Sequence, residues 1–121
     1  MPALDVMSSR DPFKNGAIDR CTRVMAAAGQ GNVDRTGVWS QRAYCDDFFL
    51  LQRALAGATD ITPAGLTGSV EALGEAYESP MTFDTSFGAG RHDGASAARD
   101  LRWDAACKCF VYVGANRALH P

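Results

Sequence analysis

The sequence predicts an α/β fold in which three helices are followed by a small, mainly antiparallel sheet. Between residues 16 and 74, apolar residues recur at three- and four-residue spacing, which is the period of an amphipathic helix. Between residues 81 and 113 the period changes to two, as in a half-buried strand. The length of 121 residues fits a single domain. We expect residues 1–15 to be irregular, as a loop or with a short strand around residues 3–6.

Capping residues define the first and third helices. The first helix is expected over residues 16–28, after Asn15 as an N-cap. The third is expected over residues 63–73, because Thr62 is a good N-cap and Pro63 occupies the first helical position, where a missing N–H is tolerated. A glycine follows each helix, at the position that favours a left-handed C-cap.

The second helix is expected over residues 37–56 and carries the widest apolar face. Tyr44, Phe48, Leu51 and Leu55 recur on one stripe of this helix. Further apolar residues widen the stripe, which makes the face broad enough for burial on more than one side. The widening residues are Cys45, Phe49 and Leu50.

The sheet is expected to combine one strand with a closing hairpin. Residues 81–87 alternate as a half-buried strand, and residues 88–94 form a glycine-rich turn. Residues 97–103 and 107–113 are extended runs joined by a short turn, which predicts a β-hairpin. We expect the helices to pack on one face of this sheet, and the residues from Asn116 onward to fray.

The charge pattern argues against a nucleic-acid partner. The net charge is -2 at pH 7, so no basic field attracts phosphates. Basic residues such as Arg99 and Arg102 alternate with Asp100 and Asp104 and do not form a patch.

The cysteines indicate an oxidising compartment. The amino terminus, MPALDVMSSRDPFK, lacks the apolar core of a signal peptide, and no window approaches the run of about 18 apolar residues that spans a membrane. Four cysteines without zinc-like spacing nevertheless favour disulfides. We therefore expect an extracytoplasmic protein, at the cell surface or secreted, with the export signal outside this chain.

Two disulfides are expected. Cys21 and Cys45 lie on neighbouring predicted helices, and a bridge between them would stabilise the fold by roughly 3–4 kcal/mol in the chain-entropy treatment. Cys107 and Cys109 are two residues apart in a predicted strand, so their bridge requires local distortion. The alternatives are buried free thiols for the first pair, and other partners or a reduced compartment for the second.

His92 belongs to two functional hypotheses that its surroundings disfavour. A metal site with the carboxy-terminal cysteine pair would combine one C-x-C with a single distant histidine, whereas structural zinc sites usually combine two knuckles. A hydrolase would use His92 and Asp93 with Ser86, Ser96 or a cysteine, but the sequence has no G-x-S-x-G elbow. We therefore expect no metal, no cofactor and no enzymatic activity.

The glycines of residues 88–94 invite a phosphate-loop interpretation. Their pattern, Gly88-x-Gly90-x-x-x-Gly94, fits neither the dinucleotide fingerprint nor the P-loop. The segment leads from one predicted strand to another, so no helix dipole would hold an anion. We expect a turn in which glycine supplies one or more positive φ angles.

Three segments, in this order, resemble a known family: YCDDFFLLQRALAGA, TPAGLTGSVEALGE and MTFDTSFGAGRHDGASAARDLRWDAACKCFVYVG. They are similar to the carboxy-terminal portion of type I periplasmic substrate-binding proteins of branched-chain amino acid ABC importers. The resemblance reaches back to Asp19-Arg20-Cys21. The other matching positions are residues 44–55, 62–73, 87–94 and 101–113.

The resemblance implies the carboxy-terminal segment of a type I periplasmic-binding-protein-like fold. It also implies the import of a small-molecule solute such as an amino acid or an amide, by lobe closure and docking on a membrane permease. Members of the family have two lobes, so this chain would supply only part of the cleft. The alternative is a small secreted disulfide-containing structural or interaction domain without a transport role.

Two aromatic residues near the start of the second helix are candidate ligand contacts. Solute clefts recruit aromatic side chains, which makes Trp39 and Tyr44 candidates, although their spacing favours core packing. Exposed sheet edges and an uncovered face of the second helix would need a partner. A homodimer or a domain swap is therefore expected if the chain exists alone.

Overall fold

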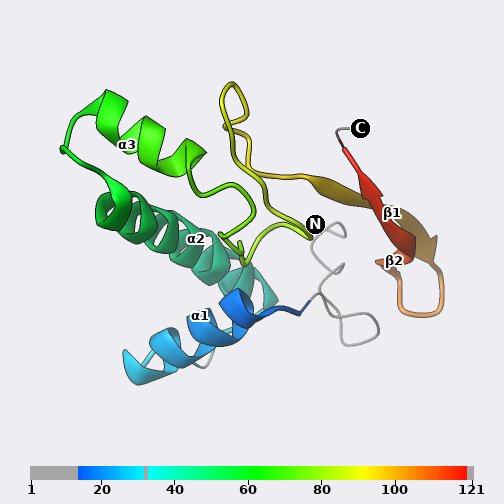
Figure 1. The fold of residues 1–121 in the computed structure, drawn as a ribbon. Coiled ribbons are helices and arrows are strands. Elements are labelled where there is room, and N and C mark those ends of the chain that lie inside the picture. Colours follow the sequence, from blue (N-terminus) through cyan, green and yellow to red (C-terminus); the bar gives the residue numbers. More distant parts are fainter. Residues whose placement is uncertain (1–13, 32, 120–121) are drawn as a thin grey trace.

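The computed structural model describes residues 14–31 and 33–119 (Figure 1). Three helices precede an antiparallel pair of strands, which confirms a mixed α/β chain. The region expected to be irregular or to hold a strand at residues 3–6 lies mostly outside the described residues. The elements are α1 (Gly16–Ala27), α2 (Arg35–Gly57), α3 (Pro63–Glu71), β1 (Ala97–Asp104) and β2 (Cys109–Ala118).

The helix starts follow local capping chemistry. The Asn15 side chain accepts a hydrogen bond from the Ile18 N–H at 2.8 Å, and Thr62 caps α3 as predicted. Helix α2 begins two residues earlier than expected, because Asp34 accepts from the Gly37 N–H. Helix α3 ends at Glu71, two residues short of the expected end at residue 73.

The helices form a layer in which α1 and α3 both pack against α2 (Figure 1). The core lies between this layer and the chain that follows α3. Met25, Leu50, Val70 and Leu73 surround it as partly buried residues. The buried members of the core are Cys21, Cys45, Phe49, Tyr77 and Phe87.

Only part of the wide apolar face of α2 is buried. From this helix, Cys45 and Phe49 belong to the core cluster, Leu50 packs against it and Ala54 is also buried. The predicted main stripe is wrong as a buried stripe, because Tyr44 is 64% exposed and Phe48 is 69% exposed. Leu51 and Leu55 are also exposed. The neighbouring helices cover the Cys45 side of α2 and leave this second stripe uncovered.

The predicted strand over residues 81–87 does not form. The segment makes one isolated bridge, between Thr85 and Ala95. Side-chain hydroxyls take over local hydrogen bonding here: the Met81 N–H donates to Ser79 Oγ at 2.9 Å, and the Thr82 and Thr85 hydroxyls pair at 2.8 Å. Within the part of the chain that the structure describes, the sheet therefore has two strands instead of three.

The predicted hairpin is present, but it does not carry the helices on one face. Strand β2 extends to Ala118, and Arg117 and Ala118 pair with β1, so residues 116–118 do not fray as expected; residues 120 and 121 lie outside the described residues. The hairpin projects away from the helical layer (Figure 1). Aromatic residues cover it instead: Phe83 packs edge-on against Tyr112, with ring centroids 4.8 Å apart.

Candidate functional site

An irregular hairpin over residues 84–96, here called the site ribbon, connects the helical layer to the β-hairpin. The Ser86 N–H donates to the Gly94 carbonyl at 2.8 Å, and the Ser96 N–H donates to the Asp84 carbonyl at 2.9 Å. Because successive side chains of a paired extended segment alternate between faces, Asp84 and Ser86 lie on one face together with Ser96.

Glycines close the tip of the site ribbon. Gly88 and Arg91 exchange backbone hydrogen bonds around a tight turn, in which Gly90 has a φ of 73°. Gly94 also has a positive φ, and a Cβ there would approach Phe87 to 3.1 Å. The predicted turn with positive φ angles is confirmed, and it places Arg91 directly after the turn.

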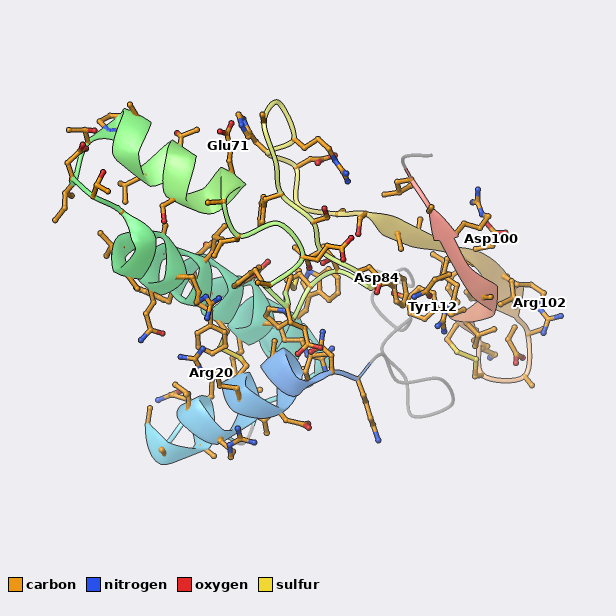
Figure 2. All side chains as sticks on the ribbon, viewed as in Figure 1. Arg20, Glu71, Asp84, Asp100, Arg102 and Tyr112 are labelled. Carbon is orange, nitrogen blue, oxygen red and sulfur yellow. A yellow bond between two sulfur atoms is a disulfide. The ribbon has the colours of Figure 1, made fainter. Side chains whose placement is uncertain are left out.

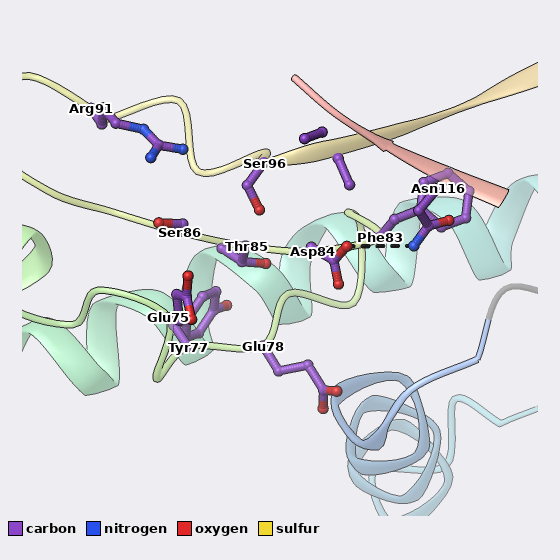
Figure 3. A pocket seen from close by; sticks show the side chains of 12 residues that line it. Glu75, Tyr77, Glu78, Phe83, Asp84, Thr85, Ser86, Arg91, Ser96 and Asn116 are labelled. Carbon is purple, nitrogen blue, oxygen red and sulfur yellow. Dashed lines mark hydrogen bonds between the residues drawn. The ribbon is translucent and has the colours of Figure 1, made fainter. Parts of the chain in front are cut away.

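A cavity of about 580 Å³ lies beside the site ribbon, between the turn after α3 and the end of β2. We call it the ribbon cavity (Figure 3). Charged and hydroxyl side chains line most of it, and a smaller apolar wall adjoins Phe83. Its lining residues are Glu75, Tyr77, Glu78, Phe83, Asp84, Thr85, Ser86, Arg91, Ser96, Ala97, Asn116 and Ala118.

Some polar groups of the ribbon cavity have structural partners. Glu78 Oε2 accepts from the Ala17 N–H at 3.0 Å, at the start of α1. Asp84 Oδ2 accepts from Asn116 Nδ2 at 3.4 Å, which links the ribbon to β2 (Figure 3). The Thr85 hydroxyl accepts from the Ser79 N–H at 3.2 Å. These contacts hold the cavity walls together.

Other polar groups of the ribbon cavity have no partner within residues 14–31 and 33–119. The Nε–H of Arg91 is buried and makes no hydrogen bond. The hydroxyls of Ser86 and Ser96 and the carboxylate of Glu75 also make none within that part of the chain. Figure 3 shows the Arg91 guanidinium and the Ser96 hydroxyl extending from the ribbon into the same space. The two hydroxyls and the carboxylate are therefore available to a ligand, and the partly exposed Arg91 side chain lines the same cavity.

Below the cavity, Tyr77 ties the turn after α3 to α2. Its hydroxyl lies 3.0 Å from the backbone carbonyl of Asp46 and also hydrogen-bonds to the Asp46 carboxylate. The Ser79 hydroxyl donates to the other carboxylate oxygen at 2.8 Å. Burial, with the Asp46 carboxylate beside it, raises the pKa of Tyr77 above its ordinary value. The phenol is therefore held in its neutral form.

The two candidate ligand residues on α2 do not line the ribbon cavity. Trp39 is half-buried in the amino-terminal half of α2, and Tyr44 is 64% exposed on its uncovered stripe. The core packing favoured for Tyr44 is thus wrong. A ligand contact by either aromatic residue stays a prediction.

Both expected disulfides are present. Cys21 and Cys45 join α1 to α2, with their Cα atoms 5.8 Å apart. Cys107 and Cys109 bridge within the turn of the β-hairpin, with Cα atoms 5.2 Å apart. Lys108, between them, has a φ of 52°, which is the local distortion that this spacing requires.

His92 points to a carboxylate on α3. Its Nε2 lies 2.7 Å from Oε1 of Glu71, the last residue of α3 (Figure 2). Within the described residues, no group of three or more histidine, cysteine, aspartate or glutamate side chains is arranged to hold a metal ion. Within the same residues, no helix is long and apolar enough to cross a membrane.

Sequence reasoning missed Arg91 and Glu75 as site residues. The glycine spacing predicted a turn, and the metal-site and hydrolase hypotheses for this segment concerned the neighbouring His92. A single arginine directly after a Gly-x-Gly turn was the available signal, because such a turn brings the next side chain back across the ribbon. Glu75 had no signal in the sequence, since only folding brings the turn after α3 close to the ribbon.

Comparison of the chain with family models, with curated proteins and with solved structures finds no match.

Proposed function

We propose that this chain is part of the solute-binding component of an ABC-type importer for amino acids or similar small organic solutes. One observation carries the proposal: the ribbon cavity presents Arg91, Ser86, Ser96 and Glu75, whose polar groups have no partner among the described residues. Solute sites combine an apolar wall with a few convergent polar groups, and they commonly enclose about 300–1,000 Å³. The ribbon cavity fits this description.

The disulfides support an extracytoplasmic location for the proposed component. Disulfides persist in oxidising compartments and are rare where thiols are kept reduced. Here all four cysteines are paired. In the proposed role the chain binds its solute without transforming it, and the complete binding protein docks on the membrane permease.

A secreted interaction domain is the second candidate, and the uncovered stripe of α2 favours it. Tyr44, Phe48, Leu51 and Leu55 are all exposed, and contiguous exposed apolar surface of this kind marks contact sites. A cavity of about 420 Å³ between α2 and α3 adjoins the stripe at Leu51. A second copy of the chain on this stripe would give a homodimer. The substitution Phe48→Gln would weaken that homodimer. Light scattering at high concentration distinguishes the two candidates, because the first requires no self-association.

Isothermal titration calorimetry tests the proposed function. The probes are the standard L-amino acids, acetamide and urea, titrated at millimolar concentration into the 121-residue chain with its disulfides intact. We expect saturable binding of at least one probe at one site per chain. Absence of saturable binding across the whole panel would contradict the proposal.

A further inference from the structure

We infer that Arg91 holds the carboxylate of the bound solute in the ribbon cavity, with Ser86 and Ser96 as hydroxyl donors and Glu75 facing a positively charged group of the same solute. The inference rests on the proposed function and deepens it, because it assigns the site and the charge pattern of the ligand.

The Arg91 side chain carries a buried hydrogen-bond donor. Its Nε–H is buried and lacks a partner among the described residues. A buried donor without an acceptor is unfavourable, because it has lost its hydrogen bonds to water and gained none from the protein. The guanidinium presents its N–H groups as a planar fork that matches the two oxygens of a carboxylate. Arg91 is partly exposed at the cavity wall, so the outer N–H groups of its guanidinium can pair with a ligand carboxylate.

Two serine residues of the site ribbon line the cavity beside Arg91. Ser86 and Ser96 belong to the two paired segments of the ribbon and lie on the same face of it. Both line the cavity with Arg91. The third hydroxyl nearby, that of Thr85, is already engaged with Thr82. Two hydroxyls without a partner among the described residues and one guanidinium thus line the same cavity (Figure 3).

The charged side chains of the cavity wall determine which solute fits. The cavity wall contains three carboxylates, from Glu75, Glu78 and Asp84, against the single guanidinium of Arg91. Glu78 and Asp84 each accept a hydrogen bond from the protein, which leaves Glu75 free to face a ligand cation. A solute with one carboxylate and one cationic group therefore fits, whereas a second negative charge would be repelled.

The ribbon cavity also has an apolar wall. Phe83, Ala97 and Ala118 line one side of the cavity, and Phe83 is held by its packing against Tyr112. An apolar part of the solute would lie there, while its charged ends face the ribbon and the turn after α3.

Calorimetry on variants tests the inference. The variants are Arg91→Gln and the double substitution Ser86→Ala/Ser96→Ala. The matched control is Arg102→Gln, an exposed arginine on β1 that does not line the cavity. The probes are each amino acid that binds in the panel, its amide, which lacks the carboxylate, and its N-acetyl derivative, which lacks the cation. Far-UV circular dichroism checks that each variant is folded.

We expect Arg91→Gln to weaken amino acid binding by about tenfold or more, and the double serine variant to weaken it by a smaller factor. Arg102→Gln should bind as the wild type does. The amide and the N-acetyl derivative should both bind more weakly than the parent amino acid, and glutamate more weakly than glutamine.

Each other outcome overturns a defined part of the account. Equal binding by wild type and Arg91→Gln, or equal binding of the acid and its amide, overturns the inference and leaves the proposed function standing. Binding of acetamide or urea alone does the same. A panel in which nothing binds overturns the proposed function and the inference with it.

Discussion

At the scale of single residues, the polar network around Asp46 explains how a tyrosine can be buried beneath a polar cavity. Tyr77 is 6% exposed, and its hydroxyl finds both the carboxylate and the backbone carbonyl of Asp46. A buried phenol is stable only when its hydroxyl has such a partner. The network fixes the turn that carries Glu75 relative to α2.

Removing the Tyr77 hydroxyl should destabilise the fold in a pH-dependent way. Tyr77→Phe is expected to lower the free energy of unfolding by about 1.5–3 kcal/mol at neutral pH, since the hydrogen bond involves a charged acceptor. The folded-state pKa of Tyr77 is raised. The contribution of its hydroxyl is therefore complete below about pH 10 and is lost as the pH rises above that value, where the unfolded chain ionises.

Urea denaturation of both proteins between neutral pH and about pH 11 measures this difference. Its decline at high pH is the expected result. A difference that stays constant or grows with pH would contradict the assigned environment of Tyr77. As a control at neutral pH, Tyr44→Phe removes an exposed hydroxyl and should change the unfolding free energy by less than about 0.5 kcal/mol.

Sequence predicts single residues well where the chemistry is local. Asn15 and Thr62 are N-caps, as their positions before apolar periodic segments indicated. Arg91 could not be predicted as a cavity residue, because its role depends on the direction of its side chain after the turn and on segments distant in the sequence. The cap at Asp34 was missed, because the second helix was expected to begin only at residue 37.

At the scale of elements, the two faces of α2 differ in what they contact. Phe49 is 7% exposed, and the Arg20 guanidinium lies 3.9 Å from its ring centroid. Its neighbour Phe48 is 69% exposed. Hydrophobic periodicity identifies both residues as apolar positions of one helix, but it cannot tell which side the neighbouring helices cover. The direction of burial is a property of the tertiary structure.

Substitution of these two adjacent phenylalanines tests which face is buried. Phe49→Ala should lower the free energy of unfolding by about 3–5 kcal/mol, because it removes a buried ring. Phe48→Gln should change it by less than about 0.5 kcal/mol in the monomer. Guanidinium denaturation at low protein concentration measures both values. A loss from Phe48→Gln as large as that from Phe49→Ala would show that the exposed stripe is covered.

The segment over residues 81–87 shows where alternation misleads. Its period of two is clear in the sequence, and Phe87 is buried as a strand residue would be. Serine and threonine hydroxyls nevertheless bond to each other and to the nearby backbone, for example between Thr82 and Thr85. Alternation reports which side chains face the core, whereas a strand also needs a partner with free backbone groups.

At the scale of the whole molecule, one disulfide joins helices and the other closes a turn. The Cys21–Cys45 bridge links residues 24 apart, whereas the Cys107–Cys109 bridge links residues 2 apart. Sequence favoured both pairs, the first because its cysteines lie on neighbouring predicted helices and the second because its alternatives required other partners or a reduced compartment. It did not predict that the β-hairpin would project away from the helices, since that depends on the irregular path of the site ribbon.

The two bridges should contribute unequally to stability. Cys21→Ala/Cys45→Ala is expected to lower the free energy of unfolding by about 3–4 kcal/mol, because it frees the longer loop in the unfolded chain. Cys107→Ala/Cys109→Ala is the matched control, and its loss should be smaller because the freed loop is very short. Urea denaturation under non-reducing conditions gives both values. Equal losses, or a larger loss for the turn pair, would contradict this assignment.

The central claim is that the ribbon cavity is the solute site, and a nuclear magnetic resonance titration tests it most directly. Backbone amide shifts are followed while the amino acids of the calorimetric panel are added to the ¹⁵N-labelled chain. We predict saturable shifts centred on Glu75, Ser86, Arg91 and Ser96. Shifts centred on Trp39 and Tyr44, or no saturable shifts with any probe, would contradict it.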